Sequence, residues 1–356
     1  MGIHNTDILV VGAGPAGCCA AQVAADAGLS VIAIDKRRVI GVPIQCAEYI
    51  PAPLGGHALS PGVKVQSIDE MLSTYNSSES ASYSCRGIMI NRSRFDQALA
   101  VRAQSAGAVL WRHCYLQALD NQVRQARVTG KKGAHTIHYK LLIAADGPRS
   151  RIAGLLGMQA LATINTRQYR VALQTRLHAS KVWLSSRYPG GYAWLFPIGR
   201  FANLGVGFES TSSAHLKKQL DIFHQGLQIE GIVSQKVYSR TGGPIPVAGL
   251  RKPLYTSNTL FVGDAAGLTH PISGAGIAAA VSSGELAGQA AVEFLLSGNS
   301  SALLDYSQDI HDLYAASLQH ALQKRRELEQ YWRLNHPMPS ELLKRFWITD
   351  PSYRLS

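Results

Sequence analysis

Residues 7–17 read DILVVGAGPAG, and this stretch decides the fold. Its apolar first half predicts a buried β-strand, and the small residues that follow its last glycine predict a helix. Gly12 permits the tight turn between them, Gly14 lets a pyrophosphate approach the backbone, and Gly17 lets the helix pack on the strand. The helix start offers amide donors and a positive dipole to phosphate groups. The order of strand, glycine turn and helix therefore predicts an α/β fold that binds a dinucleotide.

The next segment supports this interpretation. Residues 29–36 read LSVIAIDK and predict a second buried strand. The strand ends at Asp35, where a carboxylate can accept hydrogen bonds from a ribose hydroxyl. The motif alone does not distinguish NAD from FAD.

A second glycine turn, near the other end of the chain, favours a flavin. Residues 261–288 read FVGDAAGLTHPISGAGIAAAVSSGELAG, with Asp264 after an apolar strand and Gly274 and Gly276 at the start of a long helix. A carboxylate at a strand end can bind polyol hydroxyls. A helix start opened by glycines can donate amides to the edge of an isoalloxazine, where the reduced ring is negative. An ordinary strand–turn–helix explains either turn alone, but it does not explain why both are present.

Composition narrows the class of protein. The chain has 356 residues, of which 46% are hydrophobic, and a formal net charge of +12. This charge favours an anionic cofactor, an acidic partner protein or an anionic membrane surface. The basic residues are scattered and the usual modules are absent, so we expect no nucleic-acid binding.

Targeting signals and cysteines point to an ordinary cytoplasmic protein. The sequence has no apolar run of membrane-spanning length, and its first apolar stretch is too short for a signal peptide, so we expect a cytoplasmic location. The five cysteines form no CxxC pair, so we expect neither a disulfide framework nor a metal site.

Several motifs together resemble one group of flavoproteins. GAGPAG with Asp35, AADGPRSR at residues 144–151, and FVGDAAG followed by GAG are similar to the para-hydroxybenzoate hydroxylase fold. NRSRFDQALA at residues 91–100, PGGYAWLFPIG at residues 189–199 and Gly267 after GDAA resemble the geranylgeranyl reductase branch of that fold more closely. The resemblance covers most of the chain.

The strand patterns and the resemblance together predict an α/β fold with a discontinuous first domain. A Rossmann-like FAD-binding domain would comprise residues 1–165 and 250–300, an antiparallel-sheet substrate domain residues 166–249, and a C-terminal helical tail residues 301–356. NAD(P)H would dock as a transient reductant, because the chain has no second dinucleotide motif. The residues expected to bind FAD are Gly12, Gly14, Pro15, Ala16, Gly17, Asp35, Lys36, Gln45, Cys46, Arg92, Asp146, Asp264, Pro271, Gly274, Ala275, Gly276 and Ile277.

The loop GVPIQCAEYIP, residues 41–51, raises the question of a catalytic cysteine. The resemblance places Cys46 beside the flavin. No companion ligands accompany it for a metal, and the sequence places no His or cation next to it to form a reactive thiolate. It could equally be a small residue that packs at the flavin edge. Glu48 could act as an acid or base or only stabilise the loop, and His270 could donate a proton or only stabilise its own turn.

Three aromatic residues form the candidate substrate site. Tyr192, Trp194 and Phe196 occur at every second position, so a strand would place them on one face. Near a flavin, they predict an aromatic wall for a planar or long apolar substrate. The alternative is that they belong to the core, where aromatic side chains are common.

The sequence leaves the reaction open between two enzyme types. The branch resemblance favours a prenyl reductase. However, the chain is short for that branch, its residues 41–51 depart from the Cys-Gly-rich form expected there, and residues 210–250 are basic. These features suit an acidic or protein-borne substrate. The loop is similar to that of the flavin monooxygenases that hydroxylate a peptidyl tryptophan during maturation of quinohemoprotein amine dehydrogenase.

We therefore expect an NAD(P)H-driven monooxygenase that hydroxylates an aromatic ring, such as a protein-borne tryptophan, through a flavin C4a-hydroperoxide. One alternative is a geranylgeranyl-reductase-like enzyme that reduces isoprenoid C=C bonds and makes peripheral contact with a membrane. The other is a flavin-binding partner protein without turnover.

Overall fold

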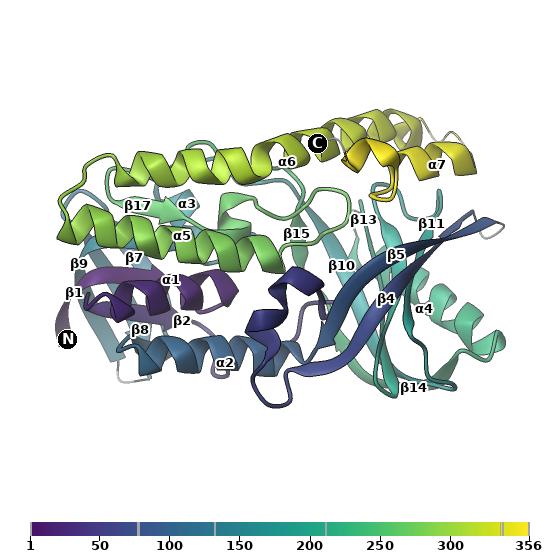
Figure 1. Ribbon diagram of the computed structural model, residues 1–356, viewed down its shortest axis with the longest axis horizontal. Helices are drawn as coiled ribbons and strands as arrows, with labels where there is room; N and C mark the ends of the chain where they lie inside the picture. The colour runs from purple at the N-terminus through teal and green to yellow at the C-terminus, as the bar shows by residue number, and fades with distance from the viewer. Residues whose placement is uncertain are drawn as a thin grey trace.

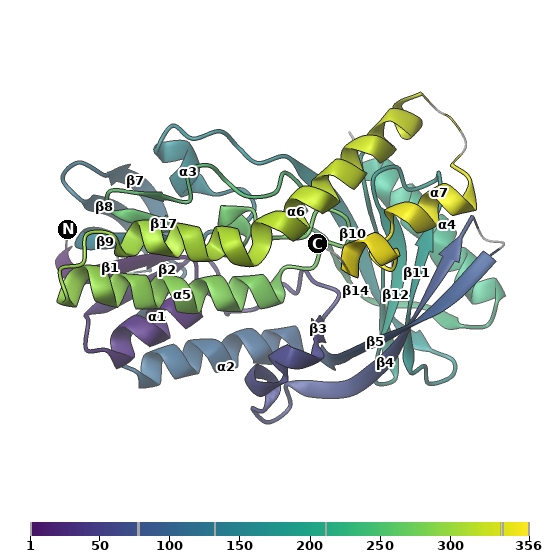
Figure 2. The ribbon, with the colours of Figure 1, turned by 45° about the horizontal axis from the view of Figure 1, so that its top comes forward.

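The computed structural model describes residues 2–76, 79–131, 133–210, 212–334, 336 and 338–354. Two β-sheets lie side by side along the longest axis of the molecule (Figure 1). Helix α6 (Ala302–Arg333) runs across both halves, and a second view shows it crossing diagonally from the first half to the second (Figure 2). The site predicted from the sequence lies where the two sheets meet.

The first sheet has a parallel core. It consists of β1 (Gly2–Val11), β2 (Val31–Asp35), β6 (Val109–Arg112), β7 (Tyr115–Asp120), β8 (Gln125–Gly130), β9 (Gly133–Ala144), β16 (Tyr255–Thr256) and β17 (Thr259–Phe261). The order is β16-β17-β9-β1-β2-β6, and β17, β9, β1, β2 and β6 pair in parallel. Every residue of β2 is buried, as expected for a parallel strand that is covered on both faces.

Helices cover this sheet. They are α1 (Pro15–Asp26), α2 (Arg92–Ser105), α3 (Arg151–Leu155), α5 (Ile277–Leu296) and the first half of α6. Gly14 is the N-cap of α1 and Pro15 takes its first helical position, where the missing amide proton costs nothing. The Asn91 side chain caps α2 by accepting from the Arg94 amide at 3.1 Å.

The second sheet is mostly antiparallel. It consists of β3 (Tyr49–Pro51), β4 (Lys64–Tyr75), β5 (Glu79–Ile90), β10 (Thr163–Leu173), β11 (Ala179–Leu184), β12 (Tyr192–Ile198), β13 (Phe201–Phe208), β14 (Val233–Thr241) and β15 (Pro244–Pro246). The order is β14-β10-β13-β12-β11-β4-β5-β3, and β15 pairs with β10. Helix α4 (Ser213–Ile229) packs on one face through Leu216, Leu220 and Leu227.

The α/β fold with a Rossmann-like first domain, a second sheet and a C-terminal helical region is confirmed. The domain boundaries stay a prediction, but the sheets divide the chain differently. The hairpin β4–β5 comes from residues 64–90, which lie within the predicted FAD-binding domain, yet β4 pairs in parallel with β11 of the second sheet. This pairing also makes the second sheet mixed rather than purely antiparallel.

The chain ends in short helices beside the second sheet. These are α7 (Ser340–Phe346) and the 3-10 helix η3 (Pro351–Arg354). In Figure 2, α7 lies over the β4–β5 side of the sheet, and the chain then returns towards α6. No helix in the described part of the chain has both the length and the hydropathy needed to cross a bilayer.

Candidate active site

The first glycine turn has the shape that a pyrophosphate requires. A Cβ on Gly12, whose φ is +104°, would lie 2.2 Å from the Ala145 carbonyl oxygen, and one on Gly17 would lie 1.8 Å from the Gly12 oxygen. These two glycines are therefore required for close packing. A Cβ on Gly14 would meet nothing within 4 Å, so this side of the turn is open. Among the described residues no side chain caps the start of α1, which leaves its amides for an anionic group.

Asp35 connects this turn to the end of β2. Its Oδ2 accepts from the Ala13 amide at 2.8 Å, and its Oδ1 accepts from Arg37 Nε at 2.9 Å. Burial alone would raise the pKa of Asp35, but its hydrogen bonds to Arg37 and Arg37's charge lower it overall. Lys36, which the sequence favoured as a cofactor residue, is exposed, and Arg37 takes the position beside the carboxylate.

The second glycine turn surrounds a half-buried carboxylate. Asp264 Oδ1 accepts from Thr269 Oγ1 at 2.7 Å. Burial raises the pKa of Asp264, and the Thr269 hydroxyl and the Arg92 charge offset only part of this effect. A Cβ on Gly276 would lie 3.3 Å from the same Oδ1, so glycine leaves the space beside the carboxylate open.

His270 holds the shape of this second turn. Its Nδ1 accepts from the amides of Ile272 and Ser273 at 3.3 and 3.2 Å, and its main-chain amide donates to the Ala275 oxygen at 2.9 Å. Burial, with a smaller effect from His320, lowers the pKa of His270 to about 4. The ring is therefore neutral near pH 7, and Nδ1 is occupied as an acceptor. These contacts favour the turn-stabilising role over proton donation.

Asp146 supplies a buried oxygen with no partner. Its Oδ2 accepts from the Ile152 amide at 3.0 Å, whereas Oδ1 is buried and has no hydrogen-bond partner among the described residues. Burial raises the pKa of this carboxyl. A buried polar atom of this kind is costly unless a ligand or water pairs with it.

Arg92 connects the second glycine turn with the Cys46 loop. Its Nε donates to Asp96 Oδ1 at 2.7 Å. Burial opposes its charge, but Asp96 and the Cys46 side chain raise the pKa of Arg92 overall. The same guanidinium acts on Asp264. The predicted residues Arg92, Cys46 and Asp264 therefore lie around one site, although they come from three distant parts of the sequence.

The Cys46 loop is held by the second sheet. Cys46 is half-buried, and its Sγ accepts a hydrogen bond from the Glu48 amide at 3.2 Å. The main-chain oxygen of Cys46 accepts one from Gln168 Nε2 at 3.0 Å. Gln168 Oε1 in turn accepts from Trp194 Nε1 at 3.1 Å. Gln45 Nε2 donates to the Gly242 oxygen at 2.6 Å. The aromatic strand and the cysteine loop are thus joined through one buried amide.

Glu48 is buried at the junction of the sheets, where only 1% of the residue is exposed. Its carboxylate accepts from the Arg92 amide at 2.9 Å, from Asn203 Nδ2 at 2.8 Å and from the Arg170 guanidinium. Its φ is +69°, a conformation that few non-glycine residues adopt. With three donors on the carboxylate, Glu48 fits a positioning role better than that of an exposed acid or base.

The aromatic residues divide between wall and core. Tyr192 donates through its hydroxyl to the Ser273 oxygen of the second turn at 2.5 Å. Trp194 lies against Gly205, where a Cβ would lie 2.2 Å from its ring, and only 7% of the residue is exposed. Phe196 contacts Tyr49 edge-on. All three face the side of β12 away from α4, as the alternation predicts, and Tyr192 lines a pocket on that side.

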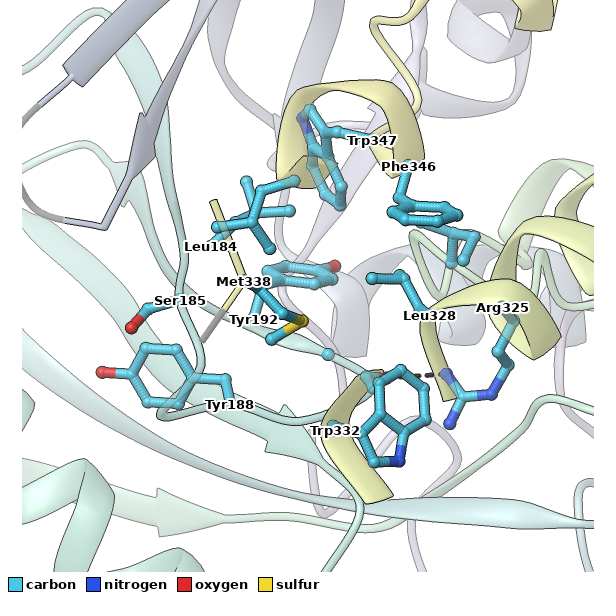
Figure 3. Close-up of a pocket in the computed structure, with 14 residues that line it drawn as sticks. Leu184, Ser185, Tyr188, Tyr192, Arg325, Leu328, Trp332, Met338, Phe346 and Trp347 are labelled. Carbon is cyan, nitrogen blue, oxygen red and sulfur yellow. Dashed lines mark hydrogen bonds between the residues drawn. The ribbon is translucent and has the colours of Figure 1, made fainter. Parts of the chain in front are cut away.

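That pocket is mainly apolar (Figure 3), and Ile272 of the second turn is among its lining residues. Ile272 and Tyr192 line it together with residues of α6 and the C-terminal segment. Arg325 lies at the edge, with Nη1 2.6 Å from the Gly190 oxygen. The lining residues are Leu184, Ser185, Tyr188, Gly190, Gly191, Tyr192, Ile272, Arg325, Leu328, Trp332, Met338, Leu343, Phe346 and Trp347.

Comparison with known proteins decides the family. Residues 7–147 match the model of the FAD-dependent oxidoreductase family. Digeranylgeranylglycerophospholipid reductase 1 of Methanopyrus kandleri is 36% identical over 313 residues, which cover 83% of each chain. The chain belongs to the geranylgeranyl-reductase-like FAD-dependent oxidoreductases. A solved geranylgeranyl bacteriochlorophyll reductase-like protein of Thermoplasma acidophilum superposes with a TM-score of 0.84 at 26% identity, covering 93% of this chain and 91% of that one.

The residues of this geranylgeranyl-reductase-like chain fit FAD. Gly14 leaves an open cradle at a helix start, Asp146 Oδ1 is a buried acceptor in need of a donor, and Asp264 lies beside the space that Gly276 keeps open. These residues would hold the pyrophosphate, the polar edge of the cofactor and its polyol, respectively. The described residues contain no group of three or more metal-ligating side chains.

The expectation of aromatic hydroxylation is wrong. The relative with 36% identity is named a reductase. A probable FAD-dependent monooxygenase of Pseudomonas aeruginosa shares only 18% identity, at a TM-score of 0.69 over 92% of this chain and 97% of that one, which shows a common fold alone. These relatives do not support a resemblance to the peptidyl-tryptophan hydroxylases.

The basic residues that had favoured an acidic substrate lie elsewhere. Lys217 and Lys218 are on α4, which packs on the face of the second sheet opposite to Tyr192. Lys236 and Arg240 are on β14 at the edge of that sheet. Charge in residues 210–250 therefore does not describe the lining of the pocket.

The structure adds site residues that the sequence did not suggest. Gln168, Arg170 and Asn203 hold the cysteine loop, and Trp347 packs against Tyr192 with ring centroids 5.0 Å apart. Arg37, which lies beside Asp35, is a further added residue. It is the one of the five with a signal in the sequence, because it follows the predicted ribose carboxylate by two residues. The others act through contacts between residues more than 100 positions apart, which no local pattern records.

Proposed function

We propose that this chain uses FAD to reduce isolated carbon–carbon double bonds of an isoprenoid chain. The observation that carries the proposal is the apolar character of the side chains beside the second glycine turn, among them Ile272 and Tyr192, whose hydroxyl is hydrogen-bonded to the Ser273 oxygen. A chain without polar groups suits such a lining. The name of the Methanopyrus kandleri relative, a digeranylgeranylglycerophospholipid reductase, supports the same substrate class.

The proposed reaction is balanced by an external donor. The double bond gains a hydride and a proton, and a reduced nicotinamide, NADH or NADPH, is oxidised. Bound and reduced FAD supplies the hydride. The protein's part is to hold the apolar chain against the flavin turn and to keep water out, which the buried residues around Tyr192 favour.

We also propose Cys46 as the source of the proton. Glu48 already accepts three hydrogen bonds, and Nδ1 of His270 is occupied by two backbone amides. The Cys46 sulfur is half-buried, lies beside Arg92 and accepts from the Glu48 amide.

The net positive charge of the chain favours a reaction at an anionic membrane surface. An excess of 12 positive charges favours approach to the anionic head group of a lipid or to an anionic membrane surface. We accordingly propose a cytoplasmic protein that contacts a membrane peripherally.

Anaerobic reduction of geranylgeranyl diphosphate tests the proposal. FAD-loaded protein is reduced either with NADPH or with dithionite, which separates donor identity from chemistry. Mass spectrometry is then expected to show the gain of two hydrogen atoms per reduced double bond, together with reoxidation of the flavin absorbance. The proposed function would be overturned if the flavin stays reduced under argon in the presence of the isoprenoid and the mass of the isoprenoid does not change.

The same assay tests Cys46. Replacing Cys46→Ala is expected to lower double-bond reduction roughly a hundredfold while the rate of flavin reduction by the donor is unchanged. Cys114→Ala, a change of a buried cysteine between β6 and β7, is the matched control and is expected to alter neither rate. Equal turnover of the two variants would leave Cys46 with a packing role only.

A further inference from the structure

The pocket behind Tyr192 is almost filled by the protein itself. Its free volume is about 30 Å³, which is room for roughly one or two water molecules. Four of its lining residues lie in residues 338–347, which we call the C-terminal arm, and three others belong to α6. Figure 3 shows Trp347, Phe346 and Met338 of this arm around the Tyr192 ring. An apolar chain that extends past Tyr192 therefore meets the arm.

The Trp347 ring packs directly against the Tyr192 ring, on the side away from the second glycine turn. The Tyr192 hydroxyl donates a hydrogen bond to the Ser273 oxygen in the second glycine turn. The Tyr192 ring contacts the Trp347 ring edge-on, with 5.0 Å between the ring centroids. Trp347 is 1% exposed, and its Nε1 donates to Ser73 Oγ of β4 at 3.0 Å. The indole is thus the next layer beyond Tyr192 on the path away from the flavin turn.

The arm is fixed at several points. Asn76 Nδ2 donates to the Met338 oxygen at 2.7 Å, and Lys344 forms an ion pair with Glu79. On the other side, Lys324 Nζ of α6 donates to the Arg345 oxygen at 3.2 Å. Anchors on the β4–β5 hairpin and on α6 hold the indole in place, so it is a wall of the pocket rather than a loose side chain.

We propose that Trp347 limits the length of the isoprenoid chain that the site accepts. The inference rests on the proposed function, because it names which members of that substrate class fit. An indole has more heavy atoms than one isoprene unit, so its removal leaves space for at least one further unit of the chain. In the intact protein, the segment of a long chain beyond the reacting double bond has no room behind Tyr192.

A chain-length series tests this proposal. Rates of reduction are measured for geranyl, farnesyl and geranylgeranyl diphosphates with the FAD-loaded protein and its Trp347→Ala and Trp347→Phe variants. We expect the ratio of kcat/KM for geranylgeranyl to that for geranyl diphosphate to rise by about tenfold or more in Trp347→Ala, and by less in Trp347→Phe. If Trp347→Ala fails to fold, the Trp347→Phe variant still tests the proposal.

Trp183→Ala is the matched control. Trp183 precedes the pocket residue Leu184 on β11, but its ring packs against Phe223 of α4 with centroids 4.9 Å apart, on the opposite face of the sheet. The length ratio is expected to stay unchanged in this variant. An unchanged ratio in folded, flavin-loaded Trp347 variants, or an equal rise in Trp183→Ala, would overturn the proposal.

Binding separates this inference from the proposed function. Calorimetric titration with geraniol and geranylgeraniol measures the same length preference without turnover. If no isoprenoid is reduced, the proposed function fails, and the ratio of the two Kd values still decides whether Trp347 limits chain length. Loss of the preference for the shorter alcohol in Trp347→Ala supports the inference, and its retention contradicts it.

Discussion

Glu48 is the residue on which the junction of the two sheets depends. It receives a backbone amide from the start of α2, a side-chain amide from β13 and a guanidinium from β10. It also positions Cys46, because its own amide donates to the sulfur. A buried carboxylate is tolerated here because each of these donors compensates for its lost hydration.

Removing this carboxylate is expected to destabilise the protein strongly. Glu48→Ala leaves the Arg170 guanidinium and Asn203 without their shared acceptor, which costs about 3 kcal/mol of unfolding free energy. Glu285→Ala is the control: the Glu285 side chain is 40% exposed and its partner, His57, is 3.5 Å away, so its loss costs less than about 1 kcal/mol. Urea unfolding measures both. If Glu48→Ala is as stable as the control but inactive, Glu48 takes part in the reaction instead.

Single residues also show where sequence reasoning ends. The glycines, Asp35 and Asp264 were predictable, because strand–turn–helix motifs are local and their chemistry follows from the backbone. Glu48 and His270 were recognised as chemically capable, but their partners come from other strands and turns. Since those partners decide whether a carboxylate or imidazole is free to react, the sequence left both roles open.

At the scale of elements, the packing of α1 on α5 sets the position of both glycine turns. A Cβ on Gly284 of α5 would lie 2.2 Å from the Ala16 oxygen of α1, and one on Gly288 would lie 2.7 Å from Val23. The two helices therefore approach as closely as backbones allow. Because each helix begins at one of the turns, their spacing determines the distance across the cofactor site.

Gly284→Ala is expected to disturb that spacing. The added methyl overlaps backbone, which cannot move aside as a side chain can, so we expect a loss of about 2 kcal/mol or more in stability and weaker FAD retention. Gly226→Ala in α4 is the matched control, since a Cβ at this position meets nothing within 4 Å. Alanine stabilises a helix by about 0.5–1 kcal/mol relative to glycine, so this variant is expected to be at least as stable as the unmodified protein. Thermal unfolding and flavin fluorescence measure both effects. Similar changes in the two variants would contradict close packing as the cause.

The elements differ in how far the sequence determines them. Strand β2 and helix α1 have strong apolar or small-residue patterns and were predicted. Strand β4 was not, because many of its side chains are exposed and polar and the alternation of apolar residues is weak. Its pairing with β11 joins residues that are about a hundred positions apart, so only the assembled sheet reveals it.

At the scale of the whole molecule, α6 connects the two halves. Its first half packs into the core of the first sheet, where the Tyr306 hydroxyl donates to the Phe261 oxygen at 2.6 Å. In its second half, Arg325 donates to the Gly190 oxygen and forms an ion pair with Glu209 beside the second sheet. A continuous helix fixes these contacts relative to one another, so we expect the two sheets to unfold together.

A break in α6 is expected to separate their unfolding. Gln319 is exposed between the two sets of contacts, and Gln319→Pro removes a helix hydrogen bond and kinks the helix at a cost of about 3 kcal/mol. Hydrogen exchange of peptides from β9 and β13, followed across a urea series, reports the two sheets separately. In the unmodified protein and in Gln319→Ala, both peptides are expected to lose protection at the same urea concentration. In Gln319→Pro the midpoints are expected to differ; if they still coincide, the buried contacts around Glu48 rather than α6 couple the halves.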